Sequence, residues 1–269
     1  MFKTTSGRIK LFQTYLRSKN HPAKIRIQNL IGKYFFGNGI KLNDEEKTIF
    51  SLMPNDWITR TILINGEYEA ASIQLAKKLL MNGGIFFDIG ANFGLYSCIL
   101  AKNKKVDVYA IEPNYMVVPA LLKNIGLNEL DNIKVLNVAL SDHFQFVNFS
   151  LPNKNNLGTA SFEVINDNPF LVMSCSLQFI FESQCIKQVE LMKIDIEGNE
   201  FTILKKFPYE KYFIKNILLE FNRLSATSFQ ELSEFFKQKG FLLKNIRGKE
   251  LLCPEDGIPE NNLWLVNTN

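Results

Sequence analysis

Histidine and cysteine are scarce in this sequence of 269 residues, and their placement excludes several kinds of site. The two histidines, His21 and His143, are too few for a histidine-rich metal centre. The cysteines form no C-x-x-C pair and no zinc-ligand spacing, and a chain of this length does not need disulfide bonds to stabilise its core. We therefore expect structural cysteines at all four positions, Cys98, Cys175, Cys185 and Cys253.

Long apolar runs are also missing. No stretch reaches the roughly 18 apolar residues that a membrane-spanning helix needs. Basic residues interrupt the N-terminal region where a signal peptide would have its apolar segment. The composition is that of a globular protein, with 46% hydrophobic and 22% charged residues. These features together predict a cytoplasmic globular protein.

Acidic residues are absent from the beginning of the chain. Nine basic side chains precede the first acidic residue, Asp44. Residues 1–80 carry 13 basic and 6 acidic residues, whereas residues 81–269 carry 18 and 21, so the net charge of +4 hides an asymmetry. A basic segment of this kind can rest on an anionic surface or meet an acidic substrate, or it can be a solvated helical face.

The N-terminal 80 residues are predicted to be mainly helical. Within residues 5–36, apolar residues recur at helical spacing in two segments, which His21-Pro22 separates. A further helix is expected over Glu69–Met81, where apolar residues share one face, and Asn82-Gly83-Gly84 ends it.

From residue 81 onward, apolar strands alternate with helices. This alternation predicts an α/β domain with a parallel sheet that helices cover on both faces. We therefore divide the chain into an N-terminal helical extension, residues 1–80, and a sheet domain, residues 81–269. The expected strands are 84–89, 106–111, 133–140, 189–194, 214–221, 241–246 and 263–266, and the expected helices are 94–102, 117–127, 200–206 and 228–239.

Residues 142–188 interrupt the alternation. They begin with an alternating segment, 144–151, that is typical of a short exposed strand, and a polar stretch follows it. An insertion of this length between sheet strands is more often functional than accidental. We expect it to help shape a substrate pocket.

The first strand of the sheet ends in a turn with two glycines. Asp88 stands at the strand end, and Gly90, Asn92 and Gly94 follow before the next helix. Glycines let the backbone approach a ligand closely, and the helix N-terminus favours a carboxylate or a phosphate. Asn92 occupies the second glycine position of the G-x-G-x-x-G fingerprint, so a dinucleotide fits poorly. Asp88 instead suits a ligand that carries an ammonium group.

The second strand of the sheet ends in Glu112-Pro113-Asn114, with Glu112 located 22 residues beyond Gly90. An acidic residue at about this distance can accept hydrogen bonds from ribose hydroxyl groups. The two motifs together predict a nucleoside ligand at the carboxyl edge of the sheet. A tight turn without a ligand is the alternative for the glycine motif alone.

Charged residues gather at the end of another expected strand. Lys193, Asp195 and Glu197 lie within five residues there, and Glu220 ends the neighbouring strand. Carboxylates are costly to desolvate without a role, so this cluster marks a candidate reaction site. For Glu200 the alternative is local capping of the next helix.

Four segments together resemble the FkbM-type S-adenosylmethionine-dependent methyltransferases: FFDIGANFG, AIEPN, NIGLNELDNIKVLNVALSD and KIDIEGNE. The resemblance extends over about residues 55–222. It implies a class I methyltransferase Rossmann-like fold, which has a seven-stranded, mostly parallel sheet with the last strand antiparallel. It also implies S-adenosylmethionine as cofactor and, usually, O-methylation of sugars or natural products.

The resemblance also assigns residues to the cofactor. Asp88, Gly90, Asn92, Gly94 and Glu112 match positions that would hold it, and Val138 and Ala139 match the segment beside the adenine. Asn114 and Asp195 complete the candidate cofactor-binding set.

For catalysis we favour Asp195 as general base, then Glu197 or Glu220, with Lys193 orienting them. The family often has an aspartate and a histidine at two acceptor-side positions that are Gln178 and Asn222 here.

Two other functions fit the sheet with less support: a non-catalytic binding module, and an NAD-dependent oxidoreductase. Asp195, Glu220 and Asn222 offer oxygen ligands of the kind that magnesium prefers, but they are scattered in the sequence, and we expect no metal. We expect a small-molecule or glycan acceptor and no nucleic acid. The basic N-terminus could mediate contact with an anionic surface or self-association into a homo-oligomer.

Overall fold

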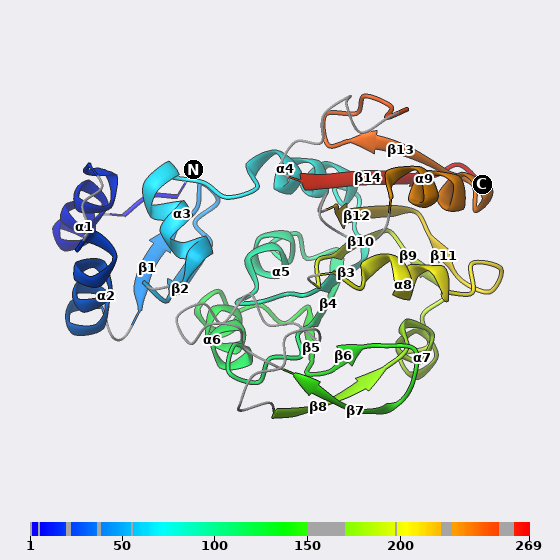
Figure 1. The fold of residues 1–269 in the computed structure, drawn as a ribbon, viewed down its shortest axis with the longest axis horizontal. Coiled ribbons are helices and arrows are strands. Elements are labelled where there is room, and N and C mark those ends of the chain that lie inside the picture. The colour runs from blue at the N-terminus through cyan, green and yellow to red at the C-terminus, as the bar shows by residue number, and fades with distance from the viewer. Residues whose placement is uncertain are drawn as a thin grey trace.

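The computed structural model describes residues 2–4, 6–19, 23–36, 39–54, 56–149, 170–196, 198–221, 228–252 and 261–269. Its centre is a seven-stranded sheet with the order β13-β14-β12-β10-β3-β4-β5 (Figure 1). β14 runs antiparallel to both of its neighbours, and the other paired strands are parallel. The mostly parallel sheet with an antiparallel last strand is therefore confirmed. The strands are β3 (Gly84–Ile89), β4 (Val106–Ile111), β5 (Ile133–Leu136), β10 (Leu191–Ile194), β12 (Asn216–Glu220), β13 (Phe241–Asn245) and β14 (Asn262–Asn267).

The strand order places a topological switch point beside β3. After β3 the chain adds β4 and β5 on one side, and it later adds β10 and β12 on the other. Phe86, Phe87 and Ile89 of β3 are fully buried, so this strand lies in the middle of the core. Ligands of open α/β sheets bind outside the carboxyl ends of the strands at such a switch point. The fold therefore directs attention to the segments that follow β3, β4, β10 and β12.

Helices cover both faces of the sheet. α4 (Ala70–Leu79), α5 (Leu95–Leu100) and α6 (Val118–Leu127) lie on one face. α7 (Leu177–Ser183), α8 (Glu200–Lys205) and α9 (Phe229–Gln238) contribute to the core on the other. These helices confirm the expected ones to within a few residues, and α7 was not expected.

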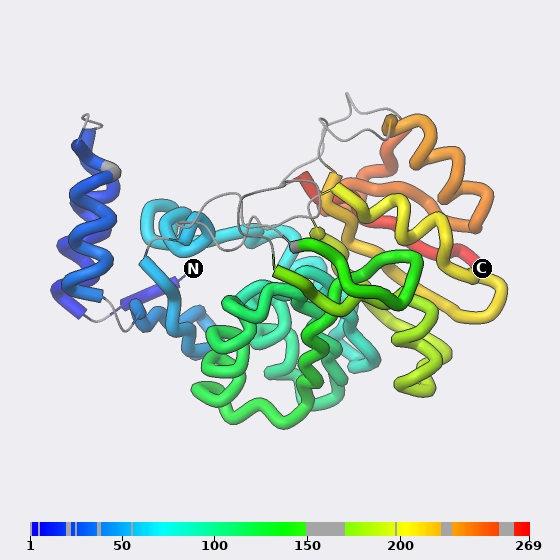
Figure 2. Tube along the Cα trace, turned by 60° about the horizontal axis from the view of Figure 1, so that its bottom comes forward, coloured from blue at the N-terminus to red at the C-terminus, as the bar shows by residue number. Residues whose placement is uncertain are grey.

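The N-terminal extension combines helices with a small sheet. It consists of α1 (Gly7–Arg17), α2 (Lys24–Phe35), β1 (Ile40–Asn43), β2 (Ile49–Leu52), α3 (Trp57–Asn65) and α4. The antiparallel pair β1–β2 and helix α3 were not expected from the sequence. Figure 2 shows α1 and α2 side by side at one end of the molecule. No helix in the described part of the chain is long and apolar enough to cross a membrane.

The extension shares its core with the sheet domain. One continuous cluster of buried side chains contains Phe12 of α1 and Phe50 of β2 together with Phe86 and Val108 of the main sheet. The sequence pattern changes at the predicted boundary, residue 80, but the buried cluster contains residues from both sides of it. Several basic residues of the extension have structural partners. Arg17 Nε, for example, donates to the carbonyl of Ile64 at 2.8 Å, and Lys24 Nζ donates to the carbonyl of Ser18.

The insertion begins with a second, smaller sheet. β6 (Ala139–Leu140), β8 (Phe170–Cys175) and β7 (Gln145–Phe149) pair in that order, and Figure 1 shows them near β5 and α7. The single strand expected over residues 133–140 is therefore wrong. Asn137 separates β5 from β6, because its side-chain amide donates to the carbonyls of Glu112 and Pro113 at 2.7 and 3.0 Å. The expected strands 189–194 and 214–221 also divide, since β9 (Gln188–Val189) pairs with β11 (Phe213–Ile214) outside the main sheet.

Asn124 of α6 and Asn128, which directly follows this helix, attach the extension to the sheet domain. Asn124 Oδ1 accepts the backbone N–H of Ser51 at 2.8 Å, and its Nδ2 donates to the carbonyl of Phe93 at 2.9 Å. Asn128 pairs with both backbone groups of Ile49 in the same manner. Asn124 is fully buried, so each of its partners depends on it for a hydrogen bond.

We predict that Asn124→Ala lowers the free energy of unfolding by about 2–4 kcal/mol, because it leaves a buried N–H and a buried carbonyl unpaired. Urea denaturation measures this change. The exposed Asn65→Ala serves as control and should stay within about 0.5 kcal/mol of wild type. Equal stability of the two variants would show that the attachment through Asn124 is dispensable.

Candidate functional site

The turn after β3 is built for close contact with the segment after β10. Gly90 has φ +81°, and a Cβ there would lie 1.8 Å from the carbonyl oxygen of Asp195. No other residue type fits without displacing the backbone. Asn92 also has positive φ, +51°, a conformation that asparagine tolerates better than most residues. The glycine turn therefore brings the ends of β3 and β10 together.

Glu112, at the end of β4, fastens this turn to the neighbouring strand. Its Oε2 accepts the N–H of Asn92 and its Oε1 accepts the N–H of Asn114, both at 2.8 Å. Burial raises the pKa of Glu112 to about 7, and the two backbone hydrogen bonds offset only part of that effect. At neutral pH the carboxyl group therefore lies close to its titration midpoint, where a hydrogen-bond donor would favour the ionised form.

Asp88 has a protein partner of its own. It is fully buried, and its Oδ2 accepts both the backbone N–H and the hydroxyl of Ser97 in α5, at 2.9 and 2.5 Å. Burial raises its pKa, against the attraction of Lys193 and these hydrogen bonds. Its expected pairing with a ligand ammonium group stays a prediction. The hydrogen bonds of Asp88 with Ser97, which fix α5 against the end of β3, were not predicted from the sequence.

Lys193 and Asp195 form a buried ion pair at the end of β10. Lys193 Nζ lies 2.8 Å from Asp195 Oδ2. Burial lowers the pKa of Lys193, but Asp195, Glu69 and Asp88 outweigh that effect and raise it above its ordinary value. Lys193 therefore stays charged.

The pair leaves Asp195 ionised and within reach of solvent. Burial raises the pKa of Asp195. The charge of Lys193 and a hydrogen bond from Glu220 of β12 lower this pKa by more than burial raises it, so the net shift is downward. The side chain of Lys193 is 5% exposed, whereas that of Asp195 is 25% exposed. Asp195 is thus the member of this pair that a substrate can contact.

The segment between α3 and α4 adds residues that the sequence did not reveal. Glu69 Oε2 accepts the hydroxyl of Tyr96 at 2.7 Å, and Lys193 Nζ lies 5.0 Å from the centre of the Tyr96 ring. Burial raises the pKa of Tyr68, and the charges of Glu69 and Asp195 raise it further. Tyr68 and Glu69 therefore lie beside the charged cluster.

The backbone of Glu69 has a strained conformation. It has φ +45°, which costs on the order of 1–3 kcal/mol for a residue other than glycine. The one signal in the sequence is the acidic Glu67-Tyr68-Glu69 segment before a helix, and that pattern alone resembles helix capping.

Glu200, at the start of α8, binds the turn that precedes it. Its Oε1 accepts the N–H of Ile196 at 2.8 Å, and its two carboxylate oxygens lie 3.2 and 3.1 Å from the N–H of Gly198. Carboxylate oxygens of Asp195, Glu200 and Glu220 lie within 4.8 Å of one another, a spacing that could hold a metal ion. Hydrogen bonds already occupy oxygens of Asp195 and Glu200.

Most of the predicted site residues meet at one edge of the sheet. Gly90, Asn92 and Gly94 form the turn, Glu112 and Asn114 border it, and Lys193, Asp195 and Glu220 lie next to it. Val138 and Ala139 follow Asn137, which is bonded to the carbonyl of Glu112. Glu197 and Asn222, like Cys253 and the polar stretch 150–169, lie outside the described residues.

The residues present at this edge fit S-adenosylmethionine. The glycine turn leaves backbone free for close approach, and Glu112 offers a carboxylate to ribose hydroxyl groups. Among the described residues, the carboxyl groups of Asp88, Glu112, Asp195 and Glu220 outnumber the single ammonium group of Lys193. A ligand with a sulfonium centre and an ammonium group would favour the ionised forms of these carboxyl groups, because a nearby positive charge lowers the pKa of a carboxyl group.

Comparisons with known proteins agree with this arrangement. The profile of the methyltransferase FkbM domain matches residues 88–243, more than half of the chain. No curated protein matches significantly.

Solved structures with a similar fold include TrmK of M. capricolum with S-adenosylhomocysteine. It has 21% identity and a TM-score of 0.43, and the match covers 74% of this chain and 68% of that one. TYW2 of M. jannaschii with AdoMet has 14% identity and a TM-score of 0.42, and the match covers 85% and 84% of the two chains.

The family match and the strand order favour a methyltransferase over the binding module and over the NAD-dependent oxidoreductase. The chain belongs to the family of FkbM methyltransferase domains, and its cofactor is S-adenosylmethionine.

Proposed function

We propose that this methyltransferase acts on a hydroxyl oxygen of a sugar, a glycan or another small natural product. The observation that carries the proposal is the ionised carboxylate of Asp195, partly exposed at the carboxyl edge and held by Lys193. A carboxylate in this state can accept a proton from an acceptor hydroxyl group. The FkbM resemblance supplies the acceptor class.

The charges around Asp195 suit a base that acts late in the reaction. S-adenosylmethionine, when bound, supplies an electrophilic methyl group. A hydroxyl oxygen becomes strongly acidic as it gains a methyl group, so a carboxylate with a lowered pKa is basic enough to take its proton. Lys193 keeps Asp195 ionised before the reaction, and Glu220 bonds to it from β12. Most of the remaining catalytic contribution comes from alignment of the acceptor.

We predict that Asp195→Asn lowers kcat about 10²–10⁴-fold. This loss should exceed any change in the affinity for S-adenosylhomocysteine, because the asparagine side chain can still form hydrogen bonds with the cofactor. Radiolabelled S-adenosylmethionine with a panel of methyl pyranosides and nucleotide sugars measures turnover, and mass spectrometry locates the methyl ether. The exposed Glu210→Gln is the matched control. Because the substitution removes the charged partner of Lys193, a thermal melt should verify that the variant is folded. Full turnover by a folded Asp195→Asn would eliminate Asp195 as the base.

The raised pKa of Glu112 predicts proton release when the cofactor product binds. Ribose hydroxyl donors favour the ionised carboxylate, so binding lowers the pKa from about 7 and releases protons near neutral pH. Affinity should accordingly rise roughly threefold to tenfold between pH 6 and pH 8. Calorimetry of S-adenosylhomocysteine binding in buffers with different ionisation enthalpies measures the release. Identical proton release by Glu112→Gln would assign it to another group.

The hydrogen bonds within the carboxylate cluster predict that methyl transfer does not depend on a divalent ion. Lys193 neutralises Asp195, and two backbone N–H groups bind Glu200. Dialysis against EDTA should therefore leave turnover unchanged. Loss of turnover that Mg²⁺ restores would instead identify Asp195, Glu200 and Glu220 as metal ligands.

A further inference from the structure

A cavity of about 500 Å³ lies between the small sheet and helix α8, beside the candidate catalytic edge. β7 and the loop before it form one wall, α8 forms another, and the start of α7 closes the cavity between them. This volume lies within the range that binds small ligands. Among the described residues, none that is assigned to the cofactor or to catalysis lines it.

Amide and hydroxyl groups line this cavity without partners. Within the described residues, the side chains of Gln145, Asn148, Asn199 and Thr202 make no hydrogen bond. Each amide offers two donors and one acceptor oxygen, and the threonine hydroxyl offers both functions. Groups of this kind can bind neighbouring hydroxyl groups, which also donate and accept.

An aromatic side chain adds an apolar surface. Phe146 of β7 lines the cavity and is 64% exposed. Its ring can cover the C–H face of a pyranose while the amides bind the hydroxyl groups around its edge. A polar wall with one exposed aromatic ring is thus complementary to a sugar on two sides.

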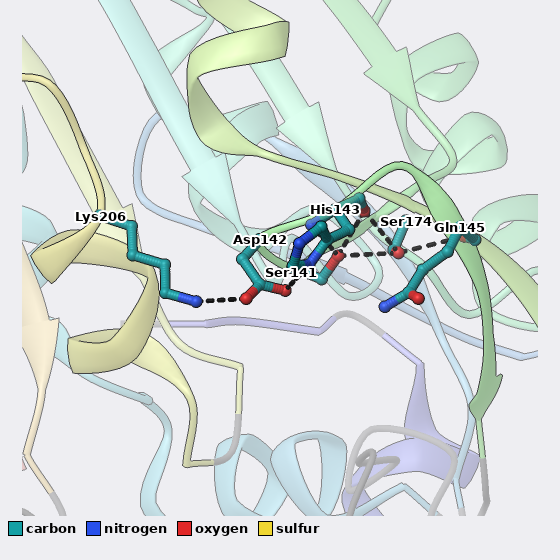
Figure 3. Close-up of polar contacts among 6 residues, drawn as sticks. All are labelled: Ser141, Asp142, His143, Gln145, Ser174 and Lys206. Atoms are coloured by element: carbon teal, nitrogen blue, oxygen red, sulfur yellow. Dashed lines mark hydrogen bonds and ion pairs between the residues drawn. The ribbon is translucent and has the colours of Figure 1, made fainter.

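The charged residues of the cavity neutralise each other. Lys206, just after α8, reaches across to Asp142 in the loop before β7, as Figure 3 shows. This ion pair and a 2.6 Å hydrogen bond from His143 Nδ1 lower the pKa of Asp142 to about 2. Among the described lining residues, Asp142 and Lys206 are the only charged ones. An uncharged, hydroxyl-rich ligand therefore suits the cavity better than a phosphorylated one.

The polar groups beside the ion pair of Asp142 and Lys206 form hydrogen bonds with each other. Ser141 Oγ donates to the carbonyl of His143 at 2.7 Å and lies 2.8 Å from Ser174 Oγ. In Figure 3 no dashed line reaches the side-chain amide of Gln145. The loop is therefore held in place by its own hydrogen bonds, while the amide stays available to a ligand.

One end of the cavity adjoins the candidate catalytic edge. Asn199 lines it and directly precedes Glu200, whose carboxylate lies within 4.8 Å of Asp195 and Glu220. Leu140 lines it as well and directly follows Val138 and Ala139. A chain of sugar units in the cavity can therefore extend toward Asp195.

We infer that this cavity is the seat for an uncharged saccharide portion of the methyl acceptor. Gln145, Asn148, Asn199 and Thr202 bind its hydroxyl groups, and Phe146 packs against one ring. The inference deepens the proposed function, and it rests on that function for the hydroxyl group that reaches Asp195.

The test uses saturation-transfer NMR with methyl pyranosides of glucose, galactose, mannose, fucose and rhamnose, together with maltotriose and chitotriose. At least one of these probes should bind wild type. The double variant Gln145→Ala with Asn148→Ala, and separately Phe146→Ala, should weaken its binding by about tenfold or more. The matched control, Asn65→Ala with Gln238→Ala, removes the same exposed side chains elsewhere and should bind as wild type does. Affinity for S-adenosylhomocysteine should be the same in all of them.

The outcomes separate this inference from the proposed function. If no probe binds wild type, or if the cavity variants bind as tightly as the control, the inference is wrong. If wild type methylates a saccharide and the cavity variants keep its KM, O-methylation stands and the cavity is not the seat. If the variants lose saccharide binding but wild type never methylates the saccharide, the cavity assignment holds and the proposed function fails.

Discussion

The buried ammonium group of Lys193 is the interaction on which the rest of the site depends. Removing an ammonium group from water costs several kcal/mol unless carboxylates surround it. Asp195 directly follows the strand that contains Lys193, Asp88 belongs to β3, and Glu69 belongs to the segment before α4. The charge of one side chain thus requires three separate segments to converge, and the convergence places a partly exposed carboxylate at the end of β10.

This requirement explains why the extension belongs to the same folded unit as the sheet. Glu69 reaches the cluster through Tyr96, and Asn124 joins β2 to the turn that contains Phe93. The sequence pattern changes from basic helical segments to strands near residue 80, but the hydrophobic core is continuous there. The strained backbone of Glu69 indicates that its position is held by the surrounding contacts rather than by local preference.

The sequence was informative where the chemistry is local. The turn from Gly90 to Gly94 and the position of Glu112 follow from spacing along two consecutive strands, because the carboxyl ends of parallel strands meet at one edge. Contacts between residues far apart in the sequence produced no pattern that could be recognised in it. Ser97 binds Asp88 from a helix whose sequence resembles any buried helix, and Glu69 meets Tyr96 across 27 residues.

Several strand boundaries were predicted wrongly for a related reason. An apolar run shows that a segment is buried but not which strand it pairs with. Residues 189–194 were therefore predicted as one strand, although β9 and β10 belong to different sheets.

The cavity and the cofactor edge differ in electrostatic character, because different charged residues line them. The edge gathers carboxyl groups around Lys193, which suits a cationic cofactor. In the described lining of the cavity, the charges of Asp142 and Lys206 cancel, so that edge and cavity do not compete for one ligand. An uncharged acceptor between them would experience little electrostatic pull toward the edge. Its position would instead depend on directional hydrogen bonds, which is the requirement for aligning one hydroxyl group among several equivalent ones.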